Sequence, residues 1–308
     1  MPSGLLNPIV FLNTTAVLFF VSLGLYVVYP KPRKAVQIHF GLLTLCLGFW
    51  FSSFIIRPFV PHSYLAPLIN LGFAISVPAP FFIFLISESY QRRVYRPNRY
   101  ILYPHIAMVI YFFYKGATFQ VLTMISKVNE PLRFEFTWVY IAVLLHALGA
   151  SIIAISRFGI RAWTTRGKTR TASILMLLGL IPPLISVGWF MWYDPTTKGM
   201  FSGGHAAIGC IIGILIWAIA ILNCNGFRIP AFSLIEPKLP WFHRFTKPIF
   251  EIMMKIFDPE YYFEQELRRK GKIAMNILIH NSELSKDHQL TAKDRALILA
   301  KVYANHLR

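Results

Sequence analysis

Charged residues are scarce in this 308-residue sequence, and acidic ones are the scarcest. Charged side chains make up 14% of the chain, and only 13 residues are Asp or Glu. An ordinary soluble domain is about a quarter charged. Hydrophobic residues make up 56% of the chain and the mean hydropathy is +0.53. This composition predicts a membrane protein, because so much apolar surface needs lipid as its solvent.

Cysteine is also rare, with three residues in the chain. Cys46 and Cys210 lie within apolar runs, and Cys224 lies at the end of the last run. We therefore expect no disulfide on an outer surface. The first apolar run has no basic residue before it and no clear small-residue cleavage pattern, so we expect a retained span rather than a signal peptide.

Seven apolar runs are candidates to cross a bilayer, which takes about 20 residues in a helix. The fourth run is the weakest, because it is short, contains Pro104 and His105, and ends at Lys115. The predicted spans lie near residues 8–29, 38–57, 65–88, 100–116, 136–157, 173–193 and 206–223. The predicted fold is an all-α integral membrane bundle of seven helices, residues 1–230, followed by a helical tail, residues 231–308.

The basic residues between these runs predict the orientation. The first, third and fifth connections carry twelve Lys and Arg, whereas the second, fourth and sixth carry five. Cytoplasmic connections are enriched in Lys and Arg. We therefore expect the N-terminus outside and the tail in the cytoplasm, in a cell (inner) membrane. Much of the formal charge of +18 thus marks the cytoplasmic side of the membrane. We therefore expect no nucleic-acid partner.

The tail predicts three helices. Residues 239–257 mix apolar and basic side chains, which favours a helix on the membrane surface that Pro248 breaks or kinks. Asp258 and Pro259 are typical of a helix start, and that helix is expected to run through about Ile279. A last helix is expected to start at Thr291, with a capping box to Asp294.

Ionisable residues within the spans are functional candidates by default, because they are costly in lipid. They are His39, Glu88, His105 and His146. Glu88 is expected to pair with Arg92 and Arg93 one turn later. The histidines are either hydrogen-bonded packing residues or part of a functional site.

The sequence lacks the patterns of two membrane protein chemistries. No His-Glu-x-x-His or His-x-x-x-His accompanies Asp194 and His205, so a zinc hydrolase is disfavoured. The last span holds no lysine for a retinal Schiff base. We assign no catalytic residue, metal or cofactor, and expect that the protein is not an enzyme.

Residues near the outer ends of the spans offer a different kind of site. An outer cavity lined by aromatic and polar side chains could take a small ligand, although the same rings suit an interfacial belt. The candidates are Arg57, His62, Trp189, Trp192, Asp194 and His205. Two further hypotheses stay open. Prolines at 78, 80, 182 and 183 could break helices as in a small transporter or permease subunit, and the chain could be a non-enzymatic scaffold.

Several motifs resemble the seven-transmembrane sensor region at the N-terminus of bacterial histidine kinases, over roughly residues 8–230. The motifs are Leu-Gly-Phe-Trp (47–50), Val-Pro-Ala-Pro-Phe-Phe-Ile-Phe-Leu (77–85) with Ser-Glu-Ser-Tyr, Gly-Leu-Ile-Pro-Pro (179–183) and Asn-Gly-Phe-Arg-Ile (225–229). The resemblance implies a sensor of an extracytoplasmic or membrane signal.

The sequence departs from those kinases after the bundle. His280 is followed by Asn-Ser-Glu-Leu, which is not the phosphoacceptor motif, and the chain has no glycine-rich ATP lid. The resemblance therefore implies a sensor that passes its signal to a separate cytoplasmic protein, with the tail as the docking element. The expected partners are the lipid bilayer, that signalling protein and an unknown small ligand.

Overall fold

A computed structural model describes residues 7–29, 33–90, 92, 95–125, 134–198, 202–223, 241–286 and 290–307. Arg93, Cys224, the motif at 225–229 and the predicted boundary at 230 lie outside these residues. The chain divides into two compact units, Met1–Glu251 and Ile252–Arg308.

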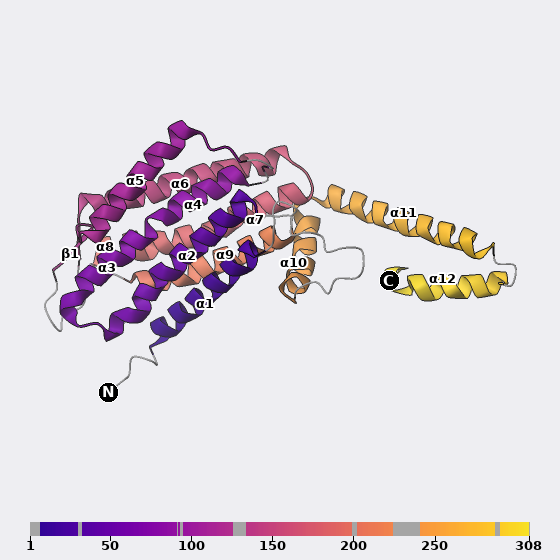
Figure 1. The fold of residues 1–308 in the computed structure, drawn as a ribbon, viewed down its shortest axis with the longest axis horizontal. Helices are drawn as coiled ribbons and strands as arrows, with labels where there is room; N and C mark the ends of the chain where they lie inside the picture. The colour runs from indigo at the N-terminus through magenta and orange to yellow at the C-terminus, as the bar shows by residue number, and fades with distance from the viewer. Residues whose placement is uncertain are drawn as a thin grey trace. The chain divides into compact units, whose positions relative to one another are not determined.

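The first unit contains a bundle of long helices (Figure 1). These helices are α1 (Pro8–Val28), α2 (Ala35–Ile56), α3 (His62–Ser76), α4 (Pro78–Ser89), α5 (Arg99–Ala117), α6 (Trp138–Thr164), α7 (Lys168–Val187) and α9 (Ala207–Asn223). Shorter elements are the 3-10 turns η1 (Arg57–Phe59) and η3 (Gly203–Ala206), the π-helical segment η2 (Gly188–Tyr193) and α8 (Asp194–Lys198).

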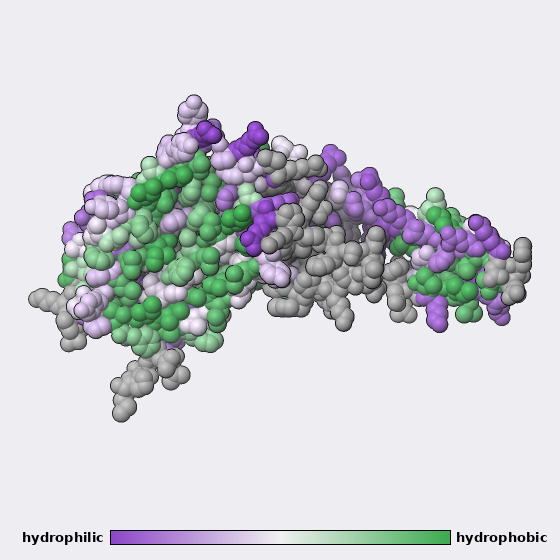
Figure 2. All heavy atoms as spheres, viewed as in Figure 1, coloured by the Kyte–Doolittle hydropathy of each residue, from purple (hydrophilic) through white to green (hydrophobic). Residues whose placement is uncertain are grey.

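Among the residues that the structure describes, six helical segments are long and apolar enough to cross a membrane. They are Pro8–Val28, Ala35–Phe59, His62–Ser89, Trp138–Thr164, Lys168–Thr197 and Gly203–Ile221. Figure 2 shows apolar side chains covering much of the visible bundle surface, where a soluble protein would be polar. The prediction of an α-helical membrane protein is confirmed. Helix α5 corresponds to the fourth predicted span and is not among the six.

Proline affects the third and sixth predicted spans differently. A single turn residue, Val77, separates α3 from α4, and Pro78 is the first residue of α4, where no backbone N–H is needed. Pro182 and Pro183 lie inside α7 without ending it. The break that a transporter would have at these two prolines is therefore absent, and the helix changes to π geometry at Gly188.

Glycines allow neighbouring helices to approach each other closely. A Cβ placed on Gly213 of α9 would lie 2.4 Å from the carbonyl oxygen of Gly179 in α7. A Cβ on Gly41 of α2 would lie 2.4 Å from a methyl carbon of Val28 in α1. Small residues drive helix association in lipid in this way, because no hydrophobic effect acts between the helices.

A short hairpin of β1 (Leu122–Met124) and β2 (Phe134–Phe136) follows α5, with Leu122 opposite Phe136. Asn70 of α3 is fully buried and holds this hairpin. Its Oδ1 accepts from the backbone N–H groups of Val121 and Leu122 at 3.0 and 2.9 Å, and its Nδ2 donates to the Leu122 carbonyl at 2.9 Å. One side chain thus satisfies three buried backbone groups.

The tail forms α10 (Trp241–Phe257), α11 (Pro259–Leu284) and α12 (Ala292–Leu307). Asp258 caps α11, because its Oδ1 accepts from the Tyr261 N–H at 3.3 Å. Thr291 and Asp294 form the predicted reciprocal cap, with backbone N–H to side-chain distances of 3.1 and 3.2 Å. Of the two outcomes expected at Pro248, a break or a kink, the break does not occur, since α10 is continuous through it.

Candidate functional site

The outer candidates are largely engaged with their own neighbours. The Arg57 guanidinium lies 4.4 Å from the centre of the Phe54 ring. Asp194 is buried and accepts a hydrogen bond from the Ser202 hydroxyl at 3.0 Å. His205 Nδ1 lies 3.1 Å from the Ser202 carbonyl oxygen. These contacts are typical of residues that hold the outer ends of the bundle together.

The two outer tryptophans face away from the protein interior. Trp189 is 49% exposed and Trp192 is 45% exposed, and the Trp189 ring packs on Tyr193 at 4.6 Å between centroids. His62, at the start of α3, is half-buried. None of the six outer candidates lines the cavity described next, so their role as a ligand site stays a prediction.

A cavity of about 150 Å³ lies within the bundle, lined from α2, α3, α4, α6, α7, η2 and α9. No pattern in the sequence marks this cavity, because its lining residues are ordinary apolar residues in seven separate segments. Aromatic, aliphatic and sulfur-containing side chains form most of its wall, including Leu43, Trp50, Phe73, Pro80, Ile83, Leu144, Ala147, Pro183, Met191, Cys210, Ile214 and Trp217.

The polar side chains at the cavity wall already have hydrogen-bond partners. Ser76 Oγ donates to the Phe73 carbonyl at 2.9 Å, and Ser151 Oγ donates to the Ala147 carbonyl at 2.8 Å. The indole N–H of Trp217 donates to the Met176 carbonyl at 2.8 Å. The cavity therefore presents an apolar surface to whatever enters it.

The π-helical segment borders this cavity through Met191. The hydroxyl of Tyr140 in α6, which is buried, donates to the backbone carbonyl of Met191. The Tyr140 ring also meets Phe73 of α3 edge to face, 5.3 Å between centroids. Tyr140 thus links α3, α6 and the π segment beside the cavity. Such single π turns occur frequently at functional sites.

Two of the predicted intramembrane candidates meet in the structure. His105 Nδ1 of α5 lies 3.2 Å from His146 Nε2 of α6. The Phe84 ring of α4 stacks on His105 at 4.8 Å between centroids. His146 is 6% exposed, and its Nδ1 is buried with no hydrogen-bond partner in the described part of the chain. The two histidines therefore act as one hydrogen-bonded unit between α5 and α6.

Glu88 also pairs differently from the prediction. Its Oε1 lies 3.2 Å from Nη2 of Arg157 in α6, and the hydroxyl of Tyr95 donates to its Oε2 at 3.1 Å. The expected partner Arg92 follows the end of α4 at Ser89, where the helical i,i+4 spacing no longer holds. Burial, and then the charge of Glu88, raises the pKa of Tyr95, which keeps this phenol a neutral donor.

Further contacts join the same region. Arg161 Nη1 of α6 donates to the Ser87 carbonyl of α4 at 2.9 Å. His39 Nδ1 of α2 lies 3.2 Å from Ser89 Oγ. The guanidinium carbon of Arg157 lies 4.8 Å from the Phe84 ring centre. The end of α4 is thus bonded to both α2 and α6, and all four intramembrane candidates lie on or beside α4.

Within the described residues, no group of three or more His, Cys, Asp or Glu could hold a metal ion. No family model, no curated protein and no solved structure matches the chain.

Proposed function

We propose that this protein is a receptor-like membrane sensor without enzymatic activity, which passes a signal to a separate cytoplasmic protein. One observation carries the proposal. Helices α4 and α6 both line the central cavity, and the same two helices are joined beyond it by the Glu88–Arg157 ion pair. A change at the cavity therefore has a direct route to the polar end of α4.

Only a few residues along each helix separate the cavity from the ion pair. Ile83 of α4 lies at the cavity, and Ser87 and Glu88 follow it by about one turn of the helix. On α6, Ser151 lies at the cavity and Arg157 follows further along the same helix. A ligand that binds one spacing of α4 and α6 more tightly than another shifts the population toward that spacing. The ion pair then forms or opens with it.

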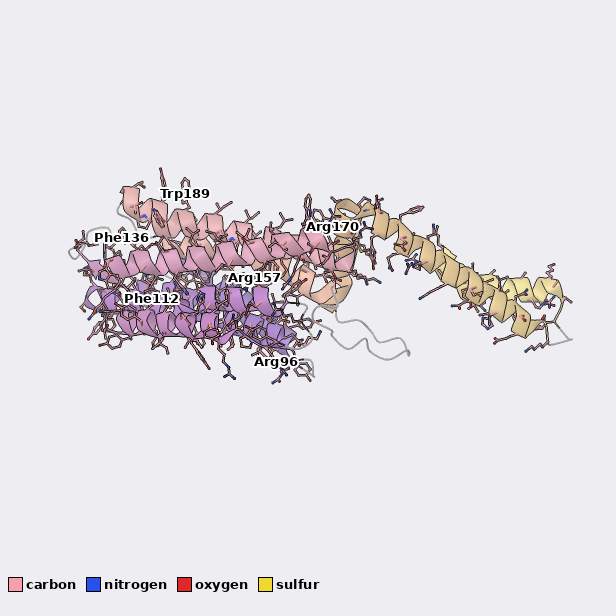
Figure 3. All side chains as sticks on the ribbon, turned by 90° about the horizontal axis from the view of Figure 1, so that it is seen from above. Arg96, Phe112, Phe136, Arg157, Arg170 and Trp189 are labelled. Carbon is pink, nitrogen blue, oxygen red and sulfur yellow. The ribbon has the colours of Figure 1, made fainter. Side chains whose placement is uncertain are left out.

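The proposed topology has seven spans, with α5 as the fourth and the tail in the cytoplasm. Two arrangements support it. Helix α5 packs along α3 and alongside α4 and α6 in the bundle (Figure 1). In Figure 3, Trp189 and Phe136 lie toward one end of the bundle, and Arg157 and Arg96 lie toward the other. Basic residues mark the cytoplasmic end of a membrane protein.

Labelling with a membrane-impermeant thiol reagent tests the topology. Asn98→Cys and Gln120→Cys place one thiol before and one after α5, both in exposed positions, in a background without native cysteines. We expect only Gln120→Cys to react in intact cells, and both to react after permeabilisation. Equal labelling of both before permeabilisation would show that α5 does not cross.

An affinity pull-down tests the function. The full chain and a version ending at Lys238, which lacks α10 to α12, are solubilised in mild detergent and their bound proteins identified by mass spectrometry. We expect a kinase, phosphatase or cyclase with the full chain only. If no signalling protein depends on the tail, the sensor proposal loses its support, and saturable flux in liposomes becomes the test of a transporter.

A further inference from the structure

We propose that the central cavity binds the uncharged hydrocarbon part of a small apolar molecule, about the size of a benzene ring. The inference rests on the proposed sensor function, because it names the class of ligand. It also moves the ligand site from the outer aromatic and polar residues to the bundle interior. Size, polarity and wall composition each support it.

The size of the cavity sets the size of the ligand. Its volume of about 150 Å³ is well above that of a single water molecule. Cavities of this volume with aliphatic and aromatic walls stay dry and bind benzene or xenon. Atoms that line an empty cavity lack dispersion partners on one side, so a molecule that fills the space adds contacts.

The polarity of the wall excludes charged and strongly hydrogen-bonding ligands. The hydroxyl protons of Ser76 and Ser151 and the indole N–H of Trp217 are all donated within the protein, so the wall has no free donor among these groups. A polar ligand would therefore lose its hydrogen bonds to water without replacing them, which costs free energy. A hydrocarbon ligand has no such bonds to lose.

The wall also favours an aromatic ring. Trp50 of α2, Phe73 of α3 and Trp217 of α9 supply aromatic surface from three different helices. Met191 adds a polarisable thioether, which makes favourable contacts with ring edges. Small residues, Ala79 and Ala147, stand where larger ones would fill the space. The cavity is only partly enclosed, so a longer molecule can place one end in it.

Two sources can supply this chemistry: a free apolar molecule, or the end of a lipid acyl chain from the bilayer. Tryptophan fluorescence separates them, because Trp50 and Trp217 line the cavity. The experiment uses the full chain in nanodiscs with the other five tryptophans changed to Phe, at 138, 163, 189, 192 and 241. The probes are bromobenzene and a phospholipid brominated at its acyl-chain end, since bromine quenches on contact.

We expect bromobenzene to quench the fluorescence saturably. Ala147→Leu fills the cavity, and it should abolish this quenching or weaken it at least tenfold. Gly149→Leu is the matched control, because it adds a side chain to the same helix where a Cβ meets nothing within 4 Å. It should leave quenching unchanged. If the brominated lipid quenches saturably and bromobenzene competes with it, the ligand is an acyl chain; bromobenzene alone indicates a free molecule.

Quenching that rises linearly with both probes, and is the same in Ala147→Leu and Gly149→Leu, would overturn the inference. If Ala147→Leu does not fold, Ile83→Phe fills the cavity from α4 and serves the same purpose. This assay needs neither the tail nor a partner protein. Failure here therefore leaves the sensor proposal standing with another ligand site, whereas failure of the pull-down leaves the apolar cavity intact.

Discussion

Glu88 of α4 is held by Arg157 of α6, with Oε1 and Nη2 3.2 Å apart. The Glu88 side chain is 10% exposed and the Arg157 side chain 27% exposed, so water screens the pair only in part. Tyr95 donates a second hydrogen bond to the same carboxylate. The pair therefore connects two helices and differs from an exposed ion pair on the protein surface.

Removing either partner of this ion pair should destabilise the bundle. We expect Glu88→Gln or Arg157→Gln to lower the free energy of unfolding by about 2 kcal/mol, because a charged group then stays buried without its counter-ion. The measurement is reversible unfolding in mixed micelles, followed by circular dichroism. Glu264→Gln, which removes the exposed pair with Arg268, is the control and should cost about 0.5 kcal/mol or less. Equal effects at Glu88 and Glu264 would contradict the prediction.

The histidine pair should behave as a unit. His146→Leu alone leaves His105 without its partner, and we expect a loss of about 1–2 kcal/mol. The double variant His105→Phe/His146→Leu removes both polar groups from the contact with Phe84 and should cost less than the sum of the single changes. The same unfolding assay gives all four corners of the cycle. Strict additivity would show that the two imidazoles do not interact.

Gly213 should not tolerate even a methyl side chain, because the backbones of α7 and α9 are in contact at this residue. Gly213→Ala places a Cβ 2.4 Å from the Gly179 carbonyl oxygen, and separating the helices should cost about 1–3 kcal/mol. Gly149→Ala meets open space and should be neutral or stabilising by up to about 1 kcal/mol, since Ala favours helix. A loss of stability at Gly213 alone is the expected outcome, and similar losses at both positions would argue against the α7–α9 contact.

Helix α10 should lie on lipid with one particular face. Thr246, Phe250 and Met254 are buried, whereas Ile252 and Ile256 are exposed apolar residues on another side. A polarity-sensitive fluorophore on Ile256→Cys should report an apolar environment in vesicles that contain acidic phospholipid. The same fluorophore on Lys247→Cys, which is exposed on the charged side of α10, should report an aqueous environment. Water-like emission from both labels in vesicles would refute the interfacial helix.

The parts of the fold that follow from local chemistry could be predicted. The apolar runs predicted the six spanning segments, and a seventh at α5, because a helix in lipid must satisfy its backbone groups within itself. The caps at Asp258 and at Thr291–Asp294 depend on residues at most three positions apart. Helix α11 nevertheless ends at Leu284 rather than near Ile279, since nothing local stops it earlier.

Proline effects could be predicted only in part. Pro78 begins a helix, where its missing N–H is no loss. Pro182, Pro183 and Pro248 lie inside continuous helices. Whether a proline ends a helix depends on whether neighbours repair the backbone around it, and this is a property of packing rather than of sequence.

Composition and apolar run length by themselves determined that this chain is a helical membrane protein with a helical tail. The reason is local: each segment in lipid must form the hydrogen bonds of its own backbone, whatever the other segments do. Only the tertiary structure decided that Glu88 pairs with Arg157, that His105 meets His146, and that seven separate segments enclose an apolar cavity. These features depend on which helix faces meet, and residues distant in the sequence carry no local sign of that choice.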